Sequence, residues 1–100
     1  MAKLFRFSFL AVLALALAGP AHAAEKLTVI LDWFVNPDHA TLIVAQQKGF
    51  FRDAGLEVEL IEPADPNDPP KLVAAGQADL AVTYQPQLHI QAAAGLPLAR

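Results

Sequence analysis

The sequence predicts an α/β fold built on an open, mostly parallel sheet with helices on both faces. Three short apolar segments within residues 27–82 have the composition of strands, and each is followed by a loop and a helix. Each predicted helix ends next to a glycine, the residue that most readily follows a helix in the left-handed conformation. Because helices connect parallel strands, this repeated order indicates a parallel sheet.

Residues 1–23 are predicted to be a signal peptide. Lys3 and Arg6 precede an apolar core at residues 7–17, and a small-residue cleavage site ends at Ala23. The alternative is an uncleaved membrane anchor, but this core is shorter than the roughly 20 residues that span a bilayer. We therefore expect cleavage near Ala23 and export to the periplasm.

The mature chain, residues 24–100, has the composition of an acidic soluble protein. The whole chain carries a net charge of −3, and removal of the two cations of the signal peptide leaves −5. A nucleic-acid partner is not expected, because such binding needs basic residues that neutralise phosphates. The chain has no cysteine, which excludes disulfides, thiolate metal sites and a lipidated cysteine. We expect a freely soluble monomer.

The first predicted strand covers residues 27–31, an apolar run rich in β-branched residues and typical of a strand buried on both faces. A loop follows at residues 32–35. Asn36 and the proline after it form a helix start, because asparagine caps helices well and proline suits the first helical position. The helix is expected to run to Lys48 and to end at Gly49.

The second strand, residues 56–61, alternates apolar and acidic residues, which predicts one wetter face and a place near the sheet edge. The segment of residues 62–70 contains four prolines and is expected to be a stiff loop. Asn67 or Asp68 is expected to cap the second helix, which ends at Gly76.

The third strand is predicted at residues 79–82 and is followed by a loop at residues 83–85. Pro86 is expected to open a third helix that runs through residue 94 and ends at Gly95.

The carboxyl ends of these strands are the predicted ligand edge. In open α/β sheets ligands bind outside the carboxyl ends of the strands, so the loops at residues 32–36, 62–68 and 83–85 should converge there. These loops contain no lysine or arginine, which argues against an anionic ligand.

The candidate ligand-binding residues are those of the first and third loops. The only tryptophan and the only tyrosine of the chain lie there, and their rings suit stacking on a flat polar heterocycle. The candidates are Asp32, Trp33, Asn36, His39, Tyr84 and Gln85. Structural roles remain open for several of them: Trp33 as a cover of the strand end, Asn36 as a helix cap and His39 as a structural histidine.

Motifs of catalysis are not found in the sequence. It contains neither phosphate-binding glycine motif, no H-E-x-x-H zinc motif and no serine in a G-x-S-x-G elbow. The residues therefore favour ligand binding over catalysis, with no cofactor and no metal expected.

Five segments together resemble a known family, the periplasmic binding proteins for thiamine pyrimidine precursors, which also includes the fungal-type pyrimidine synthases. The resemblance covers about residues 27–98. The five segments are residues 31–39, 45–51, 55–58, 63–69 and 78–86, and the most specific parts are the loop from Asp32 to His39 and the Tyr84-Gln85-Pro86 turn.

This resemblance implies a type II periplasmic binding protein that delivers its ligand to an ABC permease in the inner membrane. Residues 24–100 would be the N-terminal part of lobe 1, and the second lobe would lie outside this chain. The ligand would be formylaminopyrimidine or hydroxymethylpyrimidine. Trp33 and Tyr84 would flank the pyrimidine, and Asp32, Asn36, His39 and Gln85 would be candidates for contacts to its polar edge.

Two alternatives remain. The first is a synthase, which would use pyridoxal phosphate and iron, but Thr83 and Gln87 stand where the synthases have a lysine and a histidine. The second is the same binding fold with another cargo, such as riboflavin, a sulfonate or nitrate.

Overall fold

The computed structural model of the chain describes residues 23–100. The expected signal peptide, apart from its last residue, lies outside this range. The elements in order are β1 (Glu25–Ile30), the short 3-10 helix η1 (Pro37–His39), α2 (Ala40–Gln47), α3 (Phe50–Asp53), β2 (Leu56–Ile61), α4 (Pro69–Ala74), β3 (Leu80–Ala81) and α5 (Gln85–Ala93). The predicted α/β class is confirmed.

The three strands form one parallel sheet in the order β2-β1-β3. In the register, Ile30 of β1 faces Ile61 of β2 on one side and Ala81 of β3 on the other. Only two residues of β3 pair with β1 as a strand, whereas residues 79–82 were predicted. The hydrogen bond from the Val82 N–H to the Ile30 carbonyl, 2.8 Å long, nevertheless continues the contact of this segment with β1.

The strand β1 is the centre of the small core. Val29 and Ile30 at the end of β1 and Leu31 directly after it are 6%, 5% and 0% exposed, so this end of the strand is covered on both faces, whereas its first residues are exposed or half-buried. The strand β2 alternates between half-buried and exposed residues and lies at the sheet edge, which confirms both predictions made for it.

The helix starts and ends follow the local chemistry of the sequence. The side chain of Asn36 caps η1, Pro37 occupies its first turn, and α2 continues from it. Gly49 and Gly55 follow α2 and α3 with φ of 77°, a conformation that residues with a Cβ adopt only with strain. Asp68 takes the cap position of α4 without a side-chain hydrogen bond to the helix.

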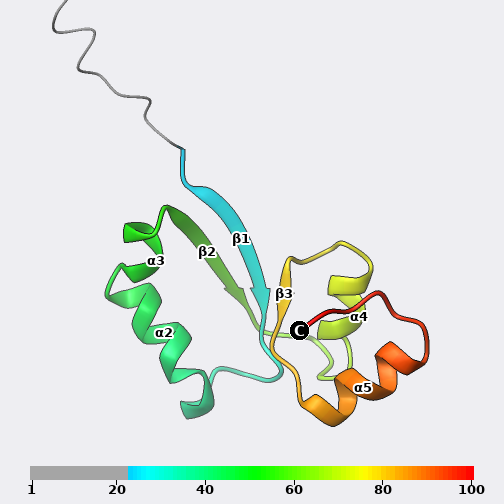
Figure 1. Cartoon of the computed structure of the whole chain (residues 1–100). Coiled ribbons are helices and arrows are strands. Elements are labelled where there is room, and N and C mark those ends of the chain that lie inside the picture. The colour runs from blue at the N-terminus through cyan, green and yellow to red at the C-terminus, as the bar shows by residue number, and fades with distance from the viewer. Residues whose placement is uncertain (1–22) are drawn as a thin grey trace, which may run out of the picture.

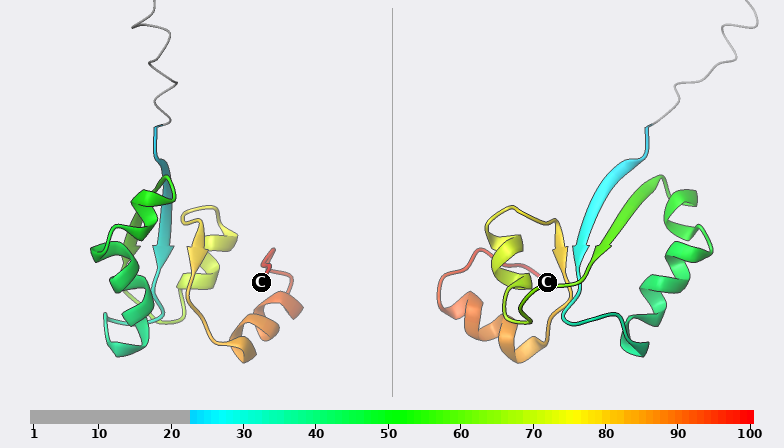
Figure 2. Two further views of the ribbon diagram at one scale, coloured as in Figure 1. Left: turned by 60° about the vertical axis from the view of Figure 1, so that its left-hand side comes forward. Right: turned by 180° about the vertical axis from the view of Figure 1, so that it is seen from behind.

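The strands all point the same way, and their loops leave at one end of the sheet (Figure 1). The helices α2 and α3 lie beside β2, whereas α4 and α5 lie on the side of β3, and the two further views agree (Figure 2). The sheet is thus flanked by helices on both sides. Within residues 23–100, no helix combines the length and the apolar character that a bilayer crossing requires.

Candidate functional site

The loops after the three strands meet at the carboxyl edge of the sheet, as predicted. The backbone N–H of Val35, in the first loop, donates a hydrogen bond of 2.7 Å to Oε1 of Glu62 at the end of β2. An open hollow of about 650 Å³ lies at this edge. Its walls are Asp32, Trp33, Pro66, Asn67, Tyr84, Gln87, Ile90 and Gln91, which come from all three loops and from α5.

Asp32 links this hollow to a buried histidine. It follows Leu31, the most buried residue of the core, so its backbone is anchored by the sheet. Its Oδ1 lies 2.6 Å from Nε2 of His39. The side chain of His39 is only 2% exposed and that of Asp32 is 14% exposed. His39 therefore stands behind Asp32 and away from the walls of the hollow.

The hydrogen bonds around His39 define its tautomer. The backbone N–H of Asn36 points at Nδ1 of His39 over 3.3 Å, so Nδ1 must accept. In the neutral ring the proton then resides on Nε2, which donates it to the carboxylate of Asp32. The contact between the Asn36 N–H and Nδ1 is the His39 half of a capping box that joins Asn36 and His39, and the Asn36 side chain also accepts from the Asp38 N–H.

The electrostatics of Asp32 favour its ionised form. Burial alone would raise the pKa of Asp32, but the hydrogen bonds of the carboxylate with His39 and Tyr84 outweigh it, and the pKa lies below its usual value. The same carboxylate raises the pKa of Tyr84, because ionising the phenol would remove its hydrogen bond to Asp32 and set two negative charges side by side. Asp32 is consequently an acceptor at neutral pH.

Two aromatic side chains stand exposed on the walls of the hollow. Trp33 is 49% exposed and Tyr84 is 64% exposed, although both are large rings that normally gain stability from burial. Trp33 contacts Phe34 in a T-shaped arrangement, with ring centres 5.6 Å apart. The arrangement can stack a flat ring and accept hydrogen bonds from its edge.

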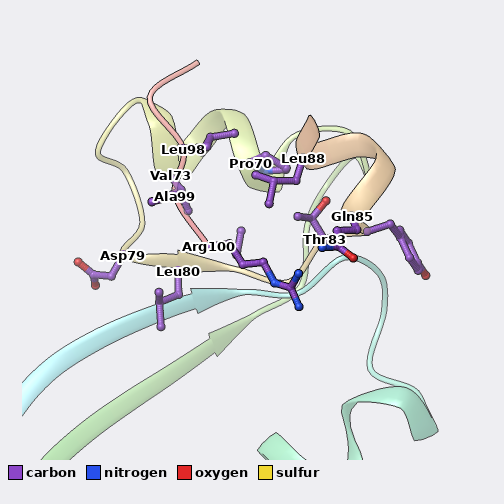
Figure 3. A pocket seen from close by; sticks show the side chains of 12 residues that line it. Pro70, Val73, Asp79, Leu80, Thr83, Gln85, Leu88, Leu98, Ala99 and Arg100 are labelled. Carbon is purple, nitrogen blue, oxygen red and sulfur yellow. The ribbon is translucent and has the colours of Figure 1, made fainter. Parts of the chain in front are cut away.

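Three of the six predicted site residues lie outside these walls: His39, which is buried behind Asp32, and also Asn36 and Gln85. The side chain of Asn36 accepts from the Asp38 N–H at 2.9 Å and donates to the Phe34 carbonyl at 2.8 Å, so it serves the backbone of its own loop. Gln85 borders a second hollow of about 550 Å³, on the side of β3 (Figure 3).

This second hollow is mainly apolar. Pro70, Val73 and Leu88 form much of its lining between α4 and α5, together with the last residues of the chain. Tyr84 borders both hollows, but Asp32 and Trp33 border only the first. The structure thus groups Asp32, Trp33 and Tyr84 around one site, with His39 directly behind it.

Several residues of the site were not predicted from the sequence. Gln87 and Gln91 line the hollow from α5, three and seven positions after Tyr84, and this helical spacing is the signal that could have identified them. The Oε1 atom of Gln91 is buried without a hydrogen-bond partner. Glu62 carries no comparable signal, since its role depends on the contact between two loops.

Comparison with known proteins gives a consistent family. The model of the family described as NMT1/THI5 like matches residues 36–100. A Haemophilus influenzae protein that is named for thiamine biosynthesis is 64% identical over 94 residues, which are 94% of this chain and 29% of that protein. The formylaminopyrimidine-binding protein of Halalkalibacterium halodurans is 38% identical over 81 residues, 81% of this chain and 24% of that protein.

An enzyme is also among the relatives. The 4-amino-5-hydroxymethyl-2-methylpyrimidine phosphate synthase of Uromyces fabae is 43% identical over 58 residues, 58% of this chain and 17% of that protein. The chain therefore spans less than a third of the length of these curated relatives. With a family model that matches 65 of its 100 residues, the chain belongs to the NMT1/THI5-like family.

Proposed function

We propose that the protein is the solute-binding component of an ABC importer for a thiamine pyrimidine precursor, formylaminopyrimidine or hydroxymethylpyrimidine. The observation that carries this proposal is the grouping of Trp33, Tyr84 and Asp32 around one hollow at the carboxyl edge of the sheet. Exposed rings can stack on the pyrimidine, and the ionised carboxylate can accept from its amino group. The formylaminopyrimidine-binding relative supports the same ligand.

The charge of the loops supports a neutral ligand over an anion. None of the three loops at this edge contains lysine or arginine, whereas Asp32, Glu62, Asp65 and Asp68 all carry carboxylates there. A sulfonate or nitrate would be bound most strongly by cationic side chains, and these loops provide none. Riboflavin, the remaining alternative cargo, is one possible outcome of the binding experiment below.

The mechanism proposed is capture followed by closure of two lobes. Residues 24–100 would be the N-terminal part of the first lobe, and a second lobe would complete the site around the ligand. A ligand that contacts both lobes binds the closed form better and shifts the population toward it. The protein would be exported under the direction of residues 1–23 and would act as a monomer. Its closed form would then be recognised by a permease in the inner membrane.

A synthase is the second candidate, favoured by the synthases among the relatives. It would use pyridoxal phosphate, which is held through a lysine, and iron. Where the synthases have a lysine and a histidine, this chain has Thr83 and Gln87. The Thr83 hydroxyl donates to Oε1 of Gln87 over 2.8 Å. Neither side chain can form a Schiff base. Among residues 23–100, no cluster of three His, Asp or Glu side chains is placed to hold a metal. The residues present therefore do not fit this cofactor pair.

Calorimetry and absorbance of the full-length protein test the proposal. Titration with formylaminopyrimidine and hydroxymethylpyrimidine should release or absorb heat and raise the melting temperature, and the purified protein should show no absorbance of bound pyridoxal phosphate. Absence of both heat and thermal shift with both pyrimidines would overturn the ligand. Binding of riboflavin, nitrate or a sulfonate in their place would select another cargo, and bound pyridoxal phosphate would favour the synthase.

A further inference from the structure

We propose that His39 is a positioning residue, which holds the Asp32 carboxylate as an oriented acceptor in the wall of the hollow and thereby selects ligands that present N–H donors. This inference rests on the proposed function for its ligand. Its structural part concerns only the contact between two side chains and can be tested without any ligand.

The first step is the direction of the hydrogen bond. A backbone N–H can only donate, so the Asn36 N–H makes Nδ1 of His39 an acceptor. Nε2 of the neutral ring then carries the hydrogen and donates to Oδ1 of Asp32 at 2.6 Å. The tautomer is therefore set by the helix start, and it leaves Asp32 as the acceptor of this bond.

The second step is rigidity. His39 is 2% exposed and belongs to η1, whose first turn is closed by the capping box with Asn36. On the other side, Asp32 directly follows Leu31, whose N–H is bonded to the Ile61 carbonyl over 2.8 Å. Both partners thus sit on well-packed backbone, which is what a site needs to hold a polar group in a defined direction.

The third step is what remains available to a ligand. A carboxylate offers about four acceptor positions on two oxygens. Nε2 of His39 hydrogen-bonds to Oδ1 of Asp32, and His39 and Tyr84 are the two side chains that act on the ionisation of Asp32; Asp38 acts on Tyr84 in turn. Asp32 still lines the hollow, so acceptor capacity is left for a ligand N–H. A ligand whose ring edge presents only acceptors would face the negative Asp32 carboxylate there. Such a ligand would be rejected.

Two substitutions separate positioning from simple structural support. In His39→Gln the side-chain amide nitrogen can reach the place of Nε2 and donate to Asp32, while the contact with the Asn36 N–H is lost. In His39→Asn the shorter side chain can accept from the Asn36 N–H but cannot reach Asp32. A third variant, Asp32→Asn, removes the charge of Asp32 and keeps the shape of its side chain. It identifies the carboxyl signal of Asp32 in the NMR spectrum.

The measurements are a ¹³C NMR titration of the aspartate carboxyls in the unliganded full-length protein, the melting temperature, and calorimetry with formylaminopyrimidine. His39→Asn should raise the pKa of Asp32 and weaken binding about 10-fold to 100-fold, the usual effect of losing a hydrogen bond to a charged group. His39→Gln should keep both values near those of the wild type, even where its melting temperature falls.

Two results would overturn the proposal: an Asp32 pKa that is the same in His39→Asn and the wild type, or affinities of the two variants that follow their melting temperatures alone. A wild-type protein that binds no pyrimidine, with an Asp32 pKa that still responds to His39→Asn, would refute the proposed ligand and retain the positioning role of His39. Should His39→Asn fail to fold, the comparison of His39→Gln with Asp32→Asn decides, since only the former should keep the affinity.

Discussion

Glu62 and Val35 join two loops that are far apart in the sequence: the Glu62 carboxylate accepts the Val35 backbone N–H at 2.7 Å. The bond connects the end of the edge strand β2 to the loop that carries Trp33 and Phe34. This loop has three exposed apolar residues in a row, and two side chains hold its backbone: Glu62, and Asn36, which donates to the Phe34 carbonyl at 2.8 Å.

Removing this acceptor is expected to loosen the aromatic loop. Glu62→Ala should weaken pyrimidine binding by about threefold to tenfold, because the exposed bond is worth less than a buried one. Glu62→Gln, whose amide oxygen can still accept the N–H, should bind nearly as well as the wild type. Calorimetry measures both, and Glu59→Ala, an exposed change on β2 away from the hollow, is the control. Equal losses in Glu62→Ala and Glu62→Gln would indicate that charge, and not loop order, matters.

Trp33 is expected to contribute to ligand binding and little to folding. Trp33→Ala removes a stacking surface worth about 1–3 kcal/mol for a heterocyclic base, so affinity should fall by about 10-fold to 100-fold. The melting temperature should change little, because the side chain is 49% exposed. Phe50, at 58% exposed on α3 and remote from the hollow, offers the matched control Phe50→Ala. A large drop in stability with unchanged affinity would assign Trp33 to the fold instead.

The Asp32 carboxylate is expected to make the stability of the protein depend on pH in the acid range. Its pKa is lowered in the folded protein from the ordinary 3.8, so the ionised group stabilises the fold above that value, and this contribution is lost as the pH falls through the lower folded pKa. The melting temperature of the wild type should therefore exceed that of Asp32→Asn near neutral pH, with a difference that shrinks only below about pH 4.

Melting curves of both proteins between pH 7 and pH 2.5 measure this difference. Asp53→Asn, an exposed change on α3, is the control. A difference that already disappears well above pH 4 would mean that another group carries the effect.

Gln87 should be a contact of the ligand in addition to the residues predicted from the sequence. Gln87→Leu keeps the size of the side chain but removes its amide from the wall of the hollow, and affinity should fall by about fivefold to 30-fold. The same change at Gln77, an exposed residue outside both hollows, should have no effect on binding. Calorimetry with formylaminopyrimidine decides, and equal behaviour of the two variants would remove Gln87 from the site.

The parallel topology could be predicted because the local signals agree with one another. The apolar run before Asp32 forms the central strand, the alternating residues 56–61 form an edge strand, and Gly49 and Gly55 end their helices with positive φ. The convergence of the three loops follows from strand order alone, since parallel strands place their carboxyl ends together.

The directions of individual side chains could not be predicted to the same degree. Gln85 and Gln87 are two residues apart on α5, and the rotation of this helix about its axis decides which of them faces the hollow. The length of β3 depends on pairing with β1, and the role of Glu62 depends on a contact over 27 positions. His39 was predicted as a candidate ligand contact, whereas its burial behind Asp32 results from the capping box.

The acidic loops described above have a consequence for phosphorylated pyrimidines. A phosphate ester carries up to two negative charges, and at this edge it would approach the carboxylates of Asp32, Glu62 and Asp65 without meeting a lysine or arginine from the three loops; the fourth carboxylate, Asp68, is paired with Lys71 at 3.4 Å. Repulsion of this kind slows association and is strongest at low ionic strength. For the ligand proposed above, the acidic side chains at this edge would favour the free precursor over its phosphorylated form.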